Sequence, residues 1–238
     1  MRSNSGTTLI ELAITTSILA IIIVLTLTFV SSVSESSGVL NQVTSMQQKA
    51  NEIIEKMAES LREAKVQGLA TAGDNNITFQ IPVDYDNDQD LMDNAMAIEW
   101  GTKRMDLADT PVKGLTQKYE FVKTGEFSEA SRSVDLNQDD DLNDVFDVGH
   151  VDIVFPAGIG TDSTGSVTLT EFRQSLTPDC VIQLKGQTAA DIDNDGNNDP
   201  IFWQDGNTIR TTIFFAKTEE QEPVMVKVSS AVLLRNPQ

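Results

Sequence analysis

The chain has 238 residues and a formal net charge of −19 at pH 7, which suits one ordinary domain with additional segments. This charge disfavours nucleic acid and anionic lipid surfaces as partners, because phosphates are bound through Lys and Arg. The single cysteine, Cys180, excludes an intrachain disulfide and a cysteine-based metal site. The single histidine, His150, disfavours a histidine-rich zinc site and a Ser-His-Asp triad. The acidity favours divalent cations as ligands, or solubility outside the cell.

An apolar run from Leu9 to Val30 is interrupted only by Glu11 and by hydroxyl residues, and it contains neither Gly nor Pro. Its length is close to the roughly 20 residues that a transmembrane helix needs. It is longer than the apolar stretch of a secretory signal peptide, which is about 7–15 residues. We therefore interpret the run as a retained membrane anchor, with Arg2 favouring a cytoplasmic N-terminus.

Glu11 stands near the start of this run, where hydrocarbon penalises an ionised carboxylate. The surrounding stretch SGTTLIELAITTSILAIIIVL resembles the class III leader of the type IV pilin and pseudopilin superfamily. In that family a prepilin peptidase cuts after a Gly and methylates the new N-terminus, and a Glu near it pairs with the terminal amine of an adjacent subunit. The resemblance implies cleavage after Gly6, a mature N-terminus at Thr7 and assembly through Glu11. Thr7 stands where the family usually has Phe.

The apolar residues from Val39 to Ala64 recur mostly at steps of three and four, which predicts one face of an α-helix. Gly68 is the expected stop. We predict that the anchor and this amphipathic segment form one long helix, as the pilin resemblance implies. The alternative is two helices separated at the serine-rich stretch SSVSESSG.

Short β-rich runs separated by turn residues occupy the chain after Gly73. They are residues 77–83, 118–122, 150–155, 166–172, 180–184, 209–216 and 224–228. Several of these runs alternate with a period of two, which predicts an antiparallel sheet with one buried face. We expect that face to pack on the C-terminal half of the long helix.

These elements predict an α+β fold: a long N-terminal helix, made of a membrane anchor and an amphipathic half, packed on an antiparallel β-sheet head domain. We divide the chain into a leader (1–6), a transmembrane or filament-core helix (7–30), its amphipathic continuation (31–68) and a β-rich head with acidic loops (69–238).

Three stretches concentrate the acidic residues, at 84–93, 135–147 and 191–200. Calcium takes six to eight oxygen ligands, often from acids spaced two apart in a tight loop. In the third stretch four acids occupy positions 1, 3, 5 and 9 of such a loop, with Gly196 at the sharp turn. They are Asp191, Asp193, Asp195 and Asp199. We predict calcium there, although Phe202 occupies the position where an EF-hand has its final Glu.

The second stretch offers two overlapping ligand frames, and the sequence does not choose between them. One frame is Asp135, Asn137, Asp139 and Asn143, and the other is Asp139, Asp141, Asn143 and Asp147. In the first stretch Asp84, Asp86 and Asp88 are suitably spaced, but no Gly follows them, and there we favour a solvated acidic turn.

The length and the ending VSSAVLLRNPQ resemble the larger minor pilins and pseudopilins of the J or W kind. The resemblance implies a structural subunit of a type IV pilus or type II secretion filament. Such a subunit crosses the bacterial inner membrane once, carries its head in the periplasm or an extracellular filament, and has prepilin peptidase and other pilin subunits as partners. Two alternatives stay open: the major pilin of a surface filament, and an anchored calcium-dependent adhesin or binding module that does not polymerise. We expect no enzymatic activity, because no phosphate-binding glycine loop or catalytic Lys accompanies the paired acids.

Overall fold

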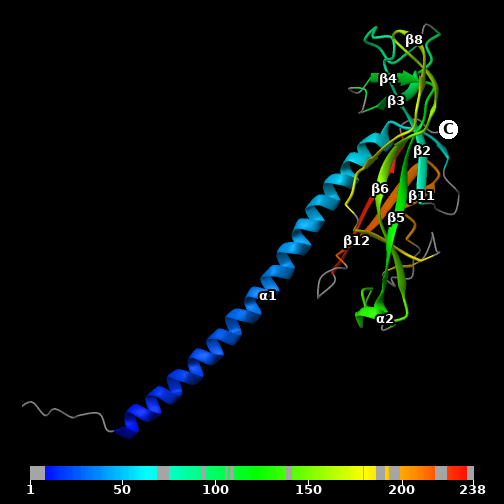
Figure 1. Cartoon of the computed structure of the whole chain (residues 1–238). Coiled ribbons are helices and arrows are strands. Elements are labelled where there is room, and N and C mark those ends of the chain that lie inside the picture. Colours follow the sequence, from blue (N-terminus) through cyan, green and yellow to red (C-terminus); the bar gives the residue numbers. More distant parts are fainter. Residues whose placement is uncertain are drawn as a thin grey trace, which may run out of the picture. The chain divides into compact units, whose positions relative to one another are not determined.

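The computed structural model describes residues 9–68, 75–92, 95–104, 107, 110–137, 141–178, 180–185, 191–192, 199–217 and 224–234. Within them the chain forms an N-terminal helix and a large antiparallel β-sheet, an α+β arrangement (Figure 1). It divides into two compact units, with the boundary between Ser45 and Met46.

Helix α1 runs from Leu9 to Arg62 as a single helix, as predicted. Its N-terminal part belongs to the first unit and consists almost entirely of exposed side chains. Its last turns belong to the second unit, which we call the β-rich unit (residues 46–238). There the predicted apolar stripe is buried, and Ala50 and Leu61 have no exposed surface. Burial of such a stripe is what stabilises an amphipathic helix in water.

The helix ends earlier than we predicted. It stops at Arg62, and Lys65–Gly68 forms strand β1, which pairs with β2 (Asn76–Pro82). Val66 is buried and lies opposite Phe79 of β2. Strand pairing with β2 is therefore more favourable for residues 65–68 than continuation of the helix, which the apolar spacing had predicted.

The described residues contain thirteen strands, and every pairing between them is antiparallel. The main path runs β11-β12-β10-β6-β5-β2-β3-β4-β7-β8, with β1 on β2, β13 on β12 and β9 on β6. The remaining elements are β3 (Trp100–Arg104), β4 (Thr110–Lys113), β5 (Gln117–Ser128), α2 (Glu129–Arg132), β6 (Val145–Phe155), β7 (Gly158–Asp162), β8 (Gly165–Leu169), β9 (Phe172–Ser175), β10 (Val181–Leu184), β11 (Phe202–Asp205), β12 (Thr208–Lys217) and β13 (Val224–Leu233). Each of the seven predicted β-rich runs overlaps at least one strand.

The expectation of one buried face is wrong for the central strands. Residues 151–155 of β6 and residues 211–216 of β12 are buried without interruption. Because successive side chains of a strand point to opposite faces, these segments are covered on both faces. The middle of the sheet is therefore a two-sided core.

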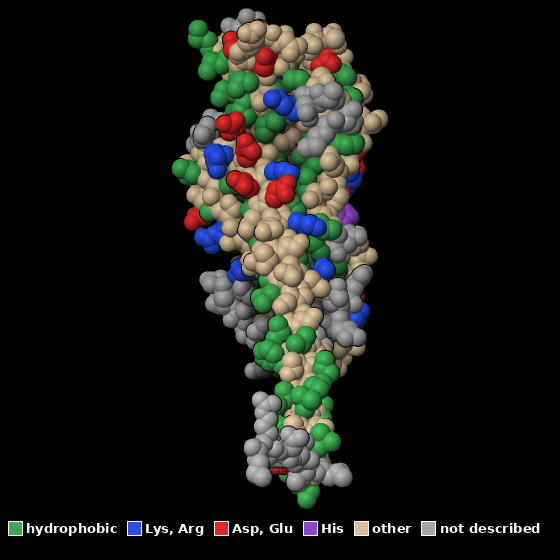
Figure 2. Space-filling model, turned by 90° about the vertical axis from the view of Figure 1, so that its left-hand side faces the viewer, with side chains coloured by type: hydrophobic (Ala, Val, Ile, Leu, Met, Phe, Trp, Pro, Cys, Tyr) green, Lys and Arg blue, Asp and Glu red, His purple; other side chains and the backbone are tan. Residues whose placement is uncertain are grey.

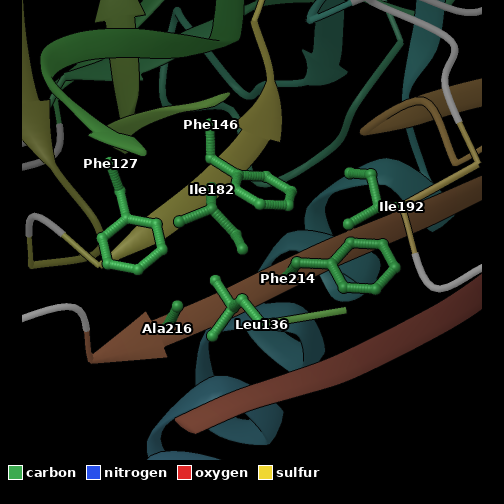
Figure 3. Packing of buried hydrophobic residues seen from close by; sticks show 7 residues of the cluster. All are labelled: Phe127, Leu136, Phe146, Ile182, Ile192, Phe214 and Ala216. Atoms are coloured by element: carbon green, nitrogen blue, oxygen red, sulfur yellow. The ribbon is translucent and has the colours of Figure 1, made fainter. Parts of the chain in front are cut away.

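One cluster of the core anchors two of the acidic stretches (Figure 3). The cluster consists of Phe127, Leu136, Phe146, Ile182, Ile192, Phe214 and Ala216. Leu136 comes from the second acidic stretch and Ile192 from the third, and each is almost completely buried. These two apolar side chains hold the polar loops around them against strands β5, β6, β10 and β12.

Candidate functional site

The N-terminal part of α1 contains a segment that is long and apolar enough to cross a bilayer. This segment, Ile10–Ser34, is strongly apolar, and its most apolar part is not buried in the protein. Figure 2 shows its apolar side chains, in green, along this part of the helix. The finding is consistent with a single-pass anchor, and a signal sequence has the same features.

Five hydroxyl residues of this segment are compatible with hydrocarbon, because each of the five bonds back to its own helix. Thr15, Ser17 and Thr26 donate to the carbonyl oxygens four residues earlier, at 2.7–2.8 Å. Thr16 and Thr28 make the same bond at 2.9 Å. A hydroxyl donor that is satisfied in this way does not need water, so these five residues do not oppose membrane insertion.

Glu11 lies in the first turn of α1 and is exposed. Its backbone carbonyl accepts the hydroxyl of Thr15. An acid near a helix N-terminus is favoured by the partial positive charge of the free N–H groups there. Gly6 and Thr7, the predicted processing residues, lie outside the described residues.

The third acidic stretch is described only at its two ends. Asp191 is half-buried and Asp199 is 5% exposed, while Asp193 and Asp195 lie outside the described residues. Asp199 accepts the N–H of Ile192 at 3.1 Å and forms an ion pair with Lys227 at 2.9 Å. A metal ion at Asp199 would therefore have to displace the ammonium group of Lys227.

The second acidic stretch forms a loop between α2 and β6 whose ends are joined. The N–H of Glu129 donates to the carbonyl oxygen of Asp144 at 3.1 Å. The side-chain amide of Asn137 donates to the carboxylate of Asp144 at 3.0 Å. Neither predicted frame included Asp144, yet it is hydrogen-bonded to Asn137, a member of the first frame.

The other predicted ligands of this stretch differ in their surroundings. Asp135 is half-buried, Asp141 and Asn143 are exposed, and Asp139 lies outside the described residues. Asn143 donates to Asp141 at 2.9 Å through its backbone N–H. Asp147 lies in strand β6 and forms an ion pair with Lys123 at 2.8 Å. The frame that ends at Asn143 therefore fits the loop better than the frame that ends at Asp147.

Glu129 is a buried acid beside this loop that the sequence analysis missed. It has no exposed surface, and its Oε1 accepts the N–H of Leu136 at 2.5 Å. Its Oε2 is buried and accepts no hydrogen bond from the described residues. Burial raises the pKa of Glu129, and the neighbouring charges of Asp144 and Asp135 raise it further. A cation here would stabilise the ionised form.

The first acidic stretch brings three acids together, although we favoured a solvated turn there. Ligand oxygens of Asp84, Asp86 and Asp88 lie within 4.8 Å of one another, the one such group of three acids found in the described part of the chain. Asp84 is half-buried, while Asp86 and Asp88 are exposed. The sharp turn that we expected to require Gly is made by Asn87 and Gln89, which have φ angles of +62° and +73°.

Glu99 closes the base of this loop and is the second buried acid that the sequence analysis missed. Its carbonyl oxygen accepts the N–H of Val83, and its own N–H donates to the carbonyl of Leu91, both at 2.9 Å. Its carboxylate accepts the N–H of Tyr85 at 3.4 Å. Burial, foremost, raises the pKa of Glu99, and the charges of Asp86 and Asp88 contribute in the same direction.

In comparisons with known proteins, no family model, no curated protein and no solved structure matches this chain.

Proposed function

We propose that this chain is a structural subunit of a type IV pilus or type II secretion filament, of the minor pilin or pseudopilin kind. The observation that carries the proposal is helix α1, whose exposed half is apolar and bears Glu11 in its first turn. In this function Ile10–Ser34 anchors the subunit in the bacterial inner membrane and later packs in the filament core. The β-rich unit is the head that faces the periplasm or the outside of the cell.

The chemistry of Glu11 suits assembly. Prepilin peptidase cuts after Gly6, and the new amine of Thr7 then lies within reach of a carboxylate four residues along the helix or on a neighbouring chain. An amine and a carboxylate attract each other more strongly in hydrocarbon than in water, because the lower dielectric screens them less. Pairing between subunits therefore favours entry into the filament over the separate membrane-bound state.

We also propose that calcium binds in the second and third acidic stretches of the head. The support comes from Glu129, whose buried and unbonded Oε2 lies beside a loop rich in oxygen ligands. Calcium-binding modules outside the cell function with dissociation constants of about 10⁻⁴–10⁻³ M, so a site with few strong ligands is sufficient there.

The test of the filament proposal is the substitution Glu11→Ala. We expect the variant to insert in the membrane but to be lost from sheared filaments, because the amine of the adjacent subunit loses its carboxylate. The measurement is immunoblotting of the membrane and filament fractions. Glu52→Ala is the matched control, since it removes an exposed acid of the same helix outside the membrane-spanning segment and should assemble normally.

Filaments that incorporate the Glu11→Ala protein as well as the native protein would contradict the proposal. That result would show that assembly does not depend on Glu11. Absence of the native protein from filaments would instead favour an anchored calcium-dependent binding module that does not polymerise. N-terminal sequencing of the mature protein checks the processing step separately, and a first residue of Thr7 is expected.

A further inference from the structure

The loop from Asp84 to Leu91 has a buried carboxylate at its base. Glu99 is 1% exposed, and both ends of the loop are tied to its backbone through Val83 and Leu91. Its side chain points into the loop, where its Oε2 meets the N–H of Tyr85. The half-buried Asp84, the exposed Asp86 and Asp88, and the buried Glu99 thus belong to one closed turn.

An oxygen of Glu99 lacks a hydrogen bond. Its Oε1 is buried and accepts no hydrogen bond from the described residues. The ammonium group of Lys113 lies 3.7 Å from this oxygen, beyond hydrogen-bond range, and lies 4.9 Å from the ring centre of Tyr85. Oδ1 of Asp84 is also buried without a hydrogen bond. The ion pair with Lys113 thus leaves Oε1 of Glu99 without a hydrogen bond, and a proton or a closer cation would satisfy it.

A proton can neutralise Glu99, but it does nothing for three further acids whose oxygens lie within 4.8 Å of one another. A divalent cation relieves both at once. The available ligands are all hard oxygens, and their positions on a loop give an irregular arrangement. Calcium accepts irregular arrangements of six to eight oxygens, whereas magnesium demands a near-ideal octahedron.

We propose that Asp84, Asp86 and Asp88 bind one calcium ion over the buried carboxylate of Glu99. This site is separate from the second and third acidic stretches, and it does not depend on filament assembly. Glu99 fixes the base of the loop and holds negative charge beneath the ion. Lys113 competes with the ion for the same carboxylate.

The test is calorimetric titration of calcium chloride into the full chain in detergent micelles after treatment with a chelator. Asp86→Asn and Asp88→Asn should each remove one bound ion from the stoichiometry. Both side chains are exposed, so neither substitution should prevent folding. Asp90→Asn is the matched control from the same loop, outside the group of three acids, and should keep the wild-type number of ions.

Two further variants test the role of the buried base. Glu99→Gln should weaken calcium binding at this site about 10- to 100-fold, the usual effect of losing a group that supports metal ligands. Lys113→Met should tighten binding, because it removes the competing positive charge. A purely structural role of Glu99 does not predict this opposite pair of effects.

Unchanged stoichiometry and affinity in Asp86→Asn and Asp88→Asn would overturn the proposal, as would magnesium binding in preference to calcium. Loss of the same ion in Asp90→Asn would also overturn it, because the stretch would then act only as diffuse negative charge. These outcomes leave the filament proposal untouched, since that proposal is tested through Glu11.

Discussion

Tyr119 illustrates how one buried side chain connects α1 to the sheet. It lies in β5, and its hydroxyl hydrogen bonds with the side chain of Ser60 in α1. Its ring packs 5.0 Å from the ring of Phe79 and 6.4 Å from that of Phe202, between ring centres. Burial raises the pKa of Tyr119 to about 12, because the phenolate would lose its hydration.

This shift predicts a loss of stability at alkaline pH. The unfolded chain releases the Tyr119 proton near pH 10, whereas the folded protein keeps it until about pH 12. The stabilisation is therefore complete below pH 10 and falls as the pH rises from 10 to 12, by about 2–3 kcal/mol. Phenolate absorbance should show a late titration step that Tyr119→Phe removes and Tyr85→Phe keeps. A phenolate titration without this late step would contradict the assignment.

The pairing of β5 with β6 depends on the absence of a side chain at Gly149. A Cβ atom at this position would lie 2.0 Å from the carbonyl oxygen of Val122, a backbone atom that cannot rotate away. Gly149 pairs with Lys123 on one side and with Val181 of β10 on the other. A side chain here would therefore disturb the centre of the sheet.

We expect Gly149→Ala to lower the free energy of unfolding by about 1–3 kcal/mol or more, as overpacking does. Gly125→Ala is the matched control, because a Cβ at Gly125 has no atom within 4 Å, and it should be neutral or slightly stabilising. The measurement is urea denaturation of both variants in detergent. Equal midpoints for the two variants would show that the sheet accommodates the added atom.

The strong β-rich runs and the helix were predictable because each carries its own periodicity. The missed strands, such as β3 and β4, are four or five residues long and contain Gly, Pro or Lys, which weaken a strand pattern. The continuous burial of β6 and β12 has a signal in the short apolar runs at 153–155 and 213–216, but we read these runs as one-sided. A short apolar run does not reveal by itself how many of its faces are covered.

The acids of the candidate sites were predictable, but the buried acids that support them were not. Glu129 is buried by contacts with Leu136 and Asp144, and Glu99 by contacts with Val83 and Tyr85. These contacts depend on how the loops close, and no local spacing encodes that. The first stretch was undervalued because Gln89 adopts a backbone conformation that we reserved for Gly.

At the scale of the whole molecule, calcium binding should be visible as stability. A ligand that binds only the folded state stabilises it by about 2.7 kcal/mol at a concentration 100 times its dissociation constant. We expect a chelator to lower the melting temperature of the full chain and calcium to restore it. A melting temperature that is indifferent to both would contradict the calcium proposals.

In this experiment, the substitution Glu129→Gln identifies the part of the calcium-induced stabilisation that comes from the second acidic stretch. The variant removes a buried charge, so the calcium-free protein should melt at the same or a higher temperature than the wild type. Its calcium-induced shift should be smaller, because one ligand is lost. Glu171→Gln, an exposed acid paired with Arg173, is the control and should keep the full shift.

The attachment of the Asp84–Leu91 loop to a single residue has a kinetic consequence. The N–H groups of Val83 and Tyr85 donate to Glu99, and the N–H of Glu99 donates to Leu91, so all three hydrogen bonds involve Glu99. One displacement of that residue breaks all three, so the amide hydrogens of Val83, Tyr85 and Glu99 should exchange with solvent through one shared opening event. An ion held above Glu99 would slow all three exchange rates by the same factor, which makes the loop a single cooperative unit on the timescale of hydrogen exchange.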